Sequence, residues 1–133
     1  MYYPDLTPYE YLKGCIDSDT LNVGWLDKAH DYVKGETPCE LLNWLFTLCL
    51  SPVNKTRGFH KCTLCKASGF GLTVQADGKE ILLGSAEIRI RANNVRVFAS
   101  PDLIYHYVKD HHYKPPDEFI VAVLNQSLNS DLL

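Results

Sequence analysis

One histidine and two cysteines fall within six residues in the segment GFHKCTLC, residues 58–65. His60 and Cys62 are separated by one residue, and Cys62 and Cys65 by two. A Cys-x-x-Cys turn can bring both sulfur atoms onto a tetrahedral Zn²⁺ at about 2.3 Å, and imidazole nitrogen is another donor that zinc prefers. The segment therefore predicts a structural zinc site, to which it supplies three of the four ligands.

The fourth ligand must come from another part of the chain. Apolar residues recur at spacings of three and four in residues 103–111, and His111 falls on the same face of this expected helix. His106 instead groups with Asp102 and Asp110 at spacings of four, which is typical of a solvated polar face. His111 is therefore the predicted fourth ligand. The other candidates, in descending order, are Cys49, Cys39, His112, His106 and His30.

Other interpretations of these residues stay open. The cysteines can be ordinary buried or surface thiols, and His111 can be a hydrogen-bonded core histidine. A redox pair is the weakest interpretation, because a thioredoxin-type Cys-x-x-Cys lies where a strand passes into a helix, and this one precedes strands. A zinc-dependent hydrolase is the alternative function: an open coordination position would activate water, with Glu87 or Asp110 as general base.

Three arginines, Arg89, Arg91 and Arg96, form a second candidate site, for an anion or a protein partner. The strand register predicted below places Arg91 opposite Arg96 and Arg89 beside Phe98. Glu87 is the acid on the same strip. Like charges that face each other destabilise a hairpin, so a bound anion or an acidic partner would relieve them. A solvated face with long flexible side chains is the alternative.

The first element expected to position these residues is a helix. Thr37, Pro38 and Glu40 have the spacing of a capping box with proline at the first helical position. Residues 41–49 then carry a broad apolar face, and Pro52 lies just beyond the expected end.

The middle of the chain predicts four antiparallel strands that are joined by tight turns. The turns are placed at residues 77–78, 84–85 and 93–94. The resulting register opposes Val74 to Ile81 and Ile90 to Val97, and it places one apolar face on the sheet. The residues predicted on that face are Leu72, Val74, Ile81, Leu83, Ala86, Ile88, Ile90 and Val97.

A sheet with one apolar face needs a covering layer. Ser100-Pro101 and Pro115-Pro116 are helix-start signals, so two more helices are expected after them. The prediction is an α+β fold, a four-stranded antiparallel meander covered on one face by about three helices, in a single domain of residues 1–133. In the first 35 residues, only the segment around Val23–Leu26 is predicted to form a strand.

The composition limits the classes of function. The chain has 133 residues, a net charge of −3 and five cysteines. An acidic balance argues against nonspecific nucleic-acid binding, and an odd cysteine count favours reduced thiols or metal ligation over a disulfide framework. The most apolar stretch, LLNWLFTLCL, is far shorter than the roughly 20 residues of a membrane span. A cytoplasmic protein without a membrane partner is therefore expected.

Several phrases together resemble a family of small bacterial proteins of unknown function, in the same order over nearly the whole length. The phrases are DLTPYEY, VGWLD, PVNKTRGFHKCTLC, LLGSAEIRI and SPDLIYHYVKDHHYKPPDEFIVAV. They contain the motifs GFHxCxxC and LIYHYVxxHxYxPPxEF. The resemblance implies a single-domain bacterial cytosolic protein and brings no activity with it. The chain departs from the pattern around KAHDYVKGETP, so His30 is given no role.

The predicted function is that of a small zinc-binding protein in which a structural Zn²⁺ clamps residues 60–65 against the helix that carries His111. It is expected to be a non-enzymatic interaction, regulatory or immunity-type module whose partner is another protein. The tyrosine-rich amino-terminal segment, with Tyr3 and Tyr9, is either a contact surface or a cover over the core.

Overall fold

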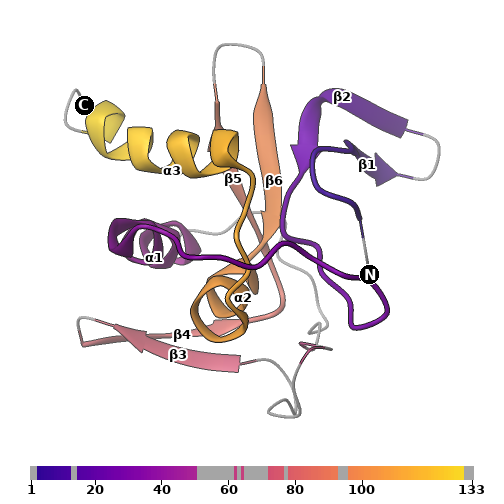
Figure 1. Cartoon of the computed structure of the whole chain (residues 1–133). Coiled ribbons are helices and arrows are strands. Elements are labelled where there is room, and N and C mark those ends of the chain that lie inside the picture. Colours follow the sequence, from indigo (N-terminus) through magenta and orange to yellow (C-terminus); the bar gives the residue numbers. More distant parts are fainter. Residues whose placement is uncertain are drawn as a thin grey trace.

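The computed structural model describes residues 3–12, 15–50, 62, 64, 72–76, 78–92 and 96–130. The chain forms an α+β fold with three helices among these residues (Figure 1). The strands are β1 (Pro8–Leu12), β2 (Cys15–Asn22), β3 (Leu72–Ala76), β4 (Lys79–Leu83), β5 (Glu87–Arg91) and β6 (Val97–Pro101). The helices are α1 (Cys39–Cys49), α2 (Ile104–His111) and α3 (Asp117–Ser130).

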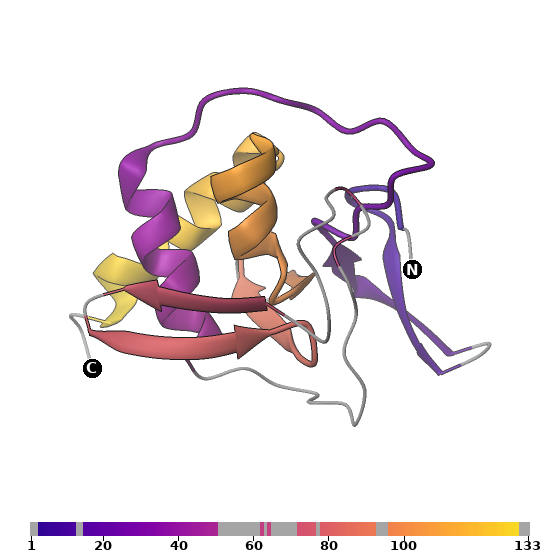
Figure 2. The same cartoon turned by 90° about the horizontal axis from the view of Figure 1, so that it is seen from below.

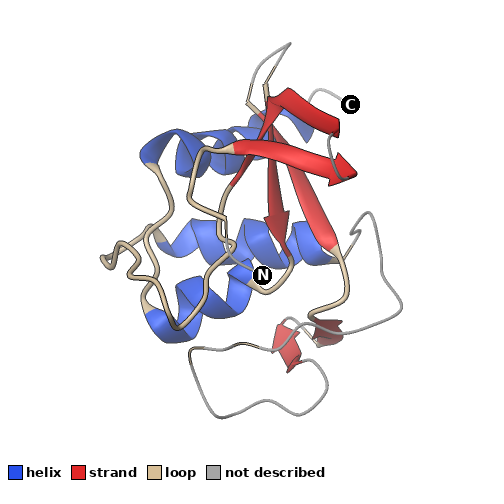
Figure 3. Cartoon of the chain, turned by 90° about the vertical axis from the view of Figure 1, so that its right-hand side faces the viewer, coloured by secondary structure: helices blue, strands red, loops and turns tan. Residues whose placement is uncertain are grey.

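The sheet topology differs from the predicted antiparallel meander. Four strands form one sheet in the order β1-β2-β6-β5, in which β2 and β6 are parallel, and β3 and β4 form a separate two-stranded sheet. Figure 3 shows the helices gathered on one side of the four-stranded sheet. The class α+β is thus confirmed, whereas the meander is wrong because β4 does not pair with β5.

The turn at residues 84–85 explains why β4 and β5 separate. The Gly84 N–H donates to Oδ1 of Asp102 at 2.8 Å, and the Asp102 N–H donates to the Ala86 carbonyl at 3.0 Å. Gly84 has a φ of 111°, which a glycine adopts without steric cost. These hydrogen bonds attach the end of β4 to Asp102, just before α2. The chain then continues into β5, which belongs to the four-stranded sheet.

Strand registers were predicted correctly in one hairpin and incorrectly in the other. In β3–β4, Val74 faces Ile81, as predicted. In β5–β6, Ile90 faces Phe98 rather than Val97, which is a slip of one residue. A slip of one residue exchanges the two faces of a strand, so Phe98 is fully buried and Val97 is half-buried. The predicted turn residues 93–94 lie outside the described part of the chain.

The structure has a hairpin near the amino terminus, β1–β2, where the sequence predicts a strand only around residues 23–26. Residues Thr20–Asn22 of β2 pair with Val97–Ala99 of β6. Trp25 is held beside this pair, because its Nε1–H donates to the Ala99 carbonyl at 3.0 Å. The β1–β2 ladder contains two register shifts, and such irregularities bend a strand. Although β1 and β5 lie at opposite ends of the sheet order, Tyr9 of β1 contacts Glu87 and Arg89 of β5.

The helices begin at or near the predicted prolines. The N-cap of α1 is Pro38, without a side-chain hydrogen bond, so the predicted capping box at Thr37 is not formed. Helix α2 begins at Ile104, later than predicted, because β6 extends to Pro101. Helix α3 follows Pro116 as predicted, and the Phe119 N–H donates to the Pro116 carbonyl.

A single core joins the helices to the sheet. Phe98 of β6 contacts Phe119 of α3 edge to face, with ring centroids 5.7 Å apart, and Phe46 of α1 contacts Tyr105 of α2 in the same manner at 5.6 Å. No described helix is long and apolar enough to cross a membrane.

Residues 27–38 form a strap that passes over the carboxyl-terminal end of α2 on the way to α1 (Figure 2). Two backbone hydrogen bonds attach it, from the Lys114 N–H to the Val33 carbonyl at 2.9 Å and from the Gly35 N–H to the His112 carbonyl at 3.0 Å. The hydroxyl of Tyr32 donates to the His111 carbonyl at 3.1 Å. The end of α2 is therefore held by the strap on one side.

Candidate metal centre

Helix α2 carries two histidines, His106 in its first turn and His111 as its last residue. His106 and His111 lie with ring centroids 4.8 Å apart, nearly perpendicular to each other. The helix ends directly after His111, because His112 has left-handed backbone dihedrals (φ 56°) and its N–H donates to the Tyr107 carbonyl. Histidine tolerates this conformation better than most residues with a Cβ.

His106 is buried, which corrects the expectation that it lies on a solvated polar face. Only 6% of its surface is exposed, and only 3% of that of Asp102. The helical periodicity was misleading because five consecutive residues of α2, from Ile104 to Val108, are buried. A helix that is covered on several sides has no continuous polar face in that stretch.

Three ligand atoms converge at the end of α2. Sγ of Cys62 lies 3.4 Å from Nε2 of His111, and this nitrogen lies 3.2 Å from Nε2 of His106. All three atoms are within 4.8 Å of one another. Around a tetrahedral Zn²⁺ with ordinary bond lengths, two nitrogens are separated by about 3.3 Å and a nitrogen and a sulfur by about 3.6 Å. The two separations at Nε2 of His111 are therefore close to those of a zinc site.

The arrangement differs from a catalytic thiol–imidazole relay. A relay uses both nitrogens of one ring, with the nucleophile at one and an orienting group at the other. Here the same atom, Nε2 of His111, contacts both the Cys62 sulfur and the His106 ring. Atoms that converge on one point are suited to hold a cation between them.

Burial favours the neutral, metal-binding form of the His111 imidazole. Cys62 is 2% exposed, and His111 is half-buried. Burial lowers the pKa of His111, and the adjacent His106 lowers it further; both effects favour the neutral form of the ring, which is the form that ligates metals. Nδ1 of His106, on the side of the ring away from His111, lies 2.8 Å from Oδ2 of Asp110.

The structure brings together part of the predicted ligand set. Cys62 and His111 lie in contact, whereas His60 and Cys65 lie outside the described residues. Cys49 is buried elsewhere, with its Sγ–H donating to the Asp102 carbonyl at 3.6 Å. Burial, followed by the charge of Asp102, raises the pKa of Cys49 far above the ordinary range of a thiol. Cys49 is thus a protonated core thiol.

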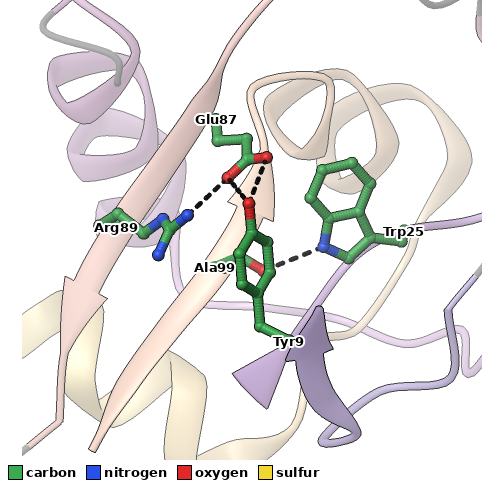
Figure 4. Close-up of polar contacts among 5 residues, drawn as sticks. All are labelled: Tyr9, Trp25, Glu87, Arg89 and Ala99. Carbon is green, nitrogen blue, oxygen red and sulfur yellow. Dashed lines mark hydrogen bonds and ion pairs between the residues drawn. The ribbon is translucent and has the colours of Figure 1, made fainter. Parts of the chain in front are cut away.

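The arginine site is partly neutralised within the chain (Figure 4). Nη2 of Arg89 lies 2.8 Å from Oε1 of Glu87, and the guanidinium stacks over the ring of Tyr9 at 4.5 Å. The Tyr9 hydroxyl donates to both carboxylate oxygens of Glu87, at 3.1 and 3.2 Å. Burial and the Glu87 charge raise the pKa of Tyr9. Arg91 faces Val97 across the hairpin, so the predicted opposition of two arginines is wrong.

Comparison with known proteins identifies the family and no more. The family described as a domain of unknown function (DUF7919) matches residues 1–124, and the chain belongs to it. No curated protein and no solved structure matches the chain. Any functional argument for this family member therefore begins at the Cys62, His106 and His111 cluster.

Proposed function

We propose that this member of the DUF7919 family is a small zinc-binding protein, in which one structural Zn²⁺ holds the segment at Cys62 against the end of α2. The observation that supports the proposal is the convergence of three ligand atoms within 4.8 Å of one another, with the two separations at Nε2 of His111 close to those of a zinc tetrahedron. The proposed role is non-enzymatic and belongs to the reducing cytoplasm, where thiolates stay available to metal.

The proposed ligand set revises the one that the sequence predicted. Cys62, His106 and His111 are three of its members, and Cys65 is the proposed fourth, with His60 as the alternative. The spacing of Cys62 and Cys65 is that of a zinc knuckle, and the spacing His106-x₄-His111 falls within the range common for paired histidine ligands. We also expect the motifs GFHxCxxC and LIYHYVxxHxYxPPxEF to recur among members of the family.

Zinc bound in this way would act through stability. A site whose ligands are far apart in the sequence does not exist in the unfolded chain, so the free energy of metal binding is added to the free energy of folding. Residue 62 and the histidines of α2 belong to segments separated by β3 to β6. The metal would therefore join two segments that no hairpin turn brings together.

The alternative hydrolase needs an open coordination position and a free general base. Both carboxylates considered for that role have other contacts. Asp110 lies beside His106, on the side of the ring away from the cluster, and Glu87 binds Arg89 and Tyr9. These contacts favour the structural role. X-ray absorption of the zinc-loaded protein separates the two, because four protein ligands support a structural site and a bound water supports a catalytic one.

Elemental analysis of tag-free protein purified under reducing conditions tests the proposal. We expect one zinc per chain in the wild type and a loss of zinc in Cys62→Ser, His106→Gln and His111→Gln. Two exposed residues give matched controls, Cys39→Ser for the thiol and His30→Gln for the imidazoles. The proposal fails if reconstituted wild type holds no zinc, or if the controls lose as much metal as the cluster variants.

A protein partner is the second part of the proposal. Arg91 and Arg96 are exposed at the same end of the β5–β6 hairpin, and they are candidates for contact with an acidic surface. Arg89 is not assigned to this contact surface, because it forms an ion pair with Glu87. Proteins captured by the wild type but not by an Arg91→Glu, Arg96→Glu variant would support the assignment, whereas capture that is unchanged in the variant would contradict it.

A further inference from the structure

We propose that Asp110 is a positioning residue of the metal centre, which orients His106 and selects the tautomer that can bind zinc. This inference rests on the proposed zinc site, and it assigns Asp110 a role other than that of a general base. Its basis is the contact between Nδ1 of His106 and Oδ2 of Asp110 at 2.8 Å.

The contact determines which nitrogen of His106 carries the proton and which carries the lone pair. The two residues are four positions apart on α2, so the helix itself places the carboxylate beside the ring. With Asp110 ionised, Nδ1–H donates to the carboxylate, and a neutral ring then has its lone pair on Nε2. Nε2 is the atom that faces His111 at 3.2 Å. The carboxylate thus directs the lone pair into the cluster.

The opposite tautomer would compete with the metal. With the proton on Nε2, His106 would donate a hydrogen bond to Nε2 of His111, because 3.2 Å is an acceptable distance for that bond. Both lone pairs would then be unavailable to zinc. A hydrogen bond from a ligating imidazole to a carboxylate prevents this, and it also makes the metal-binding nitrogen more basic.

The surroundings of the pair make the inference testable without unfolding the protein. The His106 side chain is 7% exposed, whereas that of Asp110 is 52% exposed. Removal of the carboxylate therefore leaves no buried cavity. Solvent weakens the interaction of an exposed charge, so we expect an effect near the lower end of the range known for such partners, about tenfold in metal affinity.

The experiment measures zinc affinity by competition with a chelator in wild type, Asp110→Asn and Asp110→Ala. Asp31→Ala, at an exposed position of the strap, is the matched control. We expect about tenfold weaker binding for Asp110→Ala and a smaller loss for Asp110→Asn, whose amide oxygen still accepts from Nδ1–H. The control should bind like the wild type.

Nitrogen NMR of the histidines in metal-free protein gives a second, independent result. We expect His106 to be protonated on Nδ1 in the wild type and to shift towards the Nε2–H form in Asp110→Ala. Equal affinities together with an unchanged tautomer would overturn the inference and leave the zinc site intact. A loss as large as that of His106→Gln would make Asp110 a ligand, which also overturns it. Absence of zinc from the wild type would instead refute the proposed function, while the tautomer would still test the Asp110 contact.

Discussion

At the scale of single residues, the least expected feature is a carboxylate in the core. Asp102 is 3% exposed, and its Oδ1 accepts from the Gly84 N–H. Burial raises its pKa to about 6, although backbone N–H groups oppose the shift. The residue joins the end of β4 to the start of α2, and it is therefore both a structural link and a titrating group.

The raised pKa predicts a pH dependence of stability. The folded state binds the Asp102 proton more tightly than the unfolded state does, so the contribution of Asp102 to the free energy of unfolding is largest below its ordinary pKa and is lost as the pH rises through about 6. The change amounts to up to about 3 kcal/mol. Urea denaturation in the presence of a chelator, at several pH values from about 4.5 to about 7.5, measures this change in the free energy of unfolding.

The comparison that isolates Asp102 is the difference between the wild type and Asp102→Asn. The lowered pKa of His111 acts in the opposite direction, because protonation of a neutral half-buried imidazole destabilises the folded state as the pH falls. That contribution is common to both proteins and cancels in the difference. A difference that stays constant across the pH range would show that Asp102 does not titrate there.

Tyr9 gives a prediction about the bent amino-terminal hairpin. Tyr9→Phe retains the ring under the Arg89 guanidinium and removes only the hydroxyl that donates to Glu87. We expect a loss of about 1 kcal/mol in the free energy of unfolding, since the half-buried carboxylate keeps its ion pair with Arg89. Chemical denaturation measures it, and a loss below about 0.3 kcal/mol would contradict the contact.

At the scale of elements, sequence motifs correctly predicted the features that depend on contacts between residues close together in the sequence. The β3–β4 register was correct because a two-residue turn sets it, and α3 followed its prolines. The predicted meander is wrong at Gly84, because its N–H donates to Asp102, which is 18 positions away in the sequence. His106 was ranked below His111 as a candidate ligand because the helical spacing placed it on a polar face, whereas the burial of α2 depends on the elements around it. The combination of a Cys-x-x-Cys motif and an H-x₄-H motif would have suggested both histidines together as candidate zinc ligands.

The β5–β6 register can be tested by truncation of two neighbouring side chains. Phe98 is fully buried against Phe119, so Phe98→Ala should cost about 3–5 kcal/mol of unfolding free energy. Val97 is half-buried on the opposite face, so Val97→Ala should cost less than about 1.5 kcal/mol. The predicted register, with Val97 in the core, would reverse this order.

At the scale of the whole molecule, the proposed zinc site links the segment at Cys62 to the helical layer. Saturating zinc at about 100 times its dissociation constant stabilises a protein by about 2.7 kcal/mol. We expect removal of zinc with a chelator to lower the melting temperature by about 10 °C, as measured by calorimetry. The Cys62→Ser variant should melt at the temperature of the zinc-free wild type, whether or not zinc is added. A melting temperature that rises with zinc as much as that of the wild type would contradict the assignment of Cys62 as a ligand.

The parallel contact between Thr20–Asn22 and Val97–Ala99 has a consequence for synthesis on the ribosome. The β1–β2 hairpin is translated before the strand that it must join, because α1 and β3 to β5 lie between them in the sequence. Until then, an open β edge is available to other nascent chains or to chaperones. Completion of the four-stranded sheet is therefore a late event, which follows translation of the segment that also leads into α2.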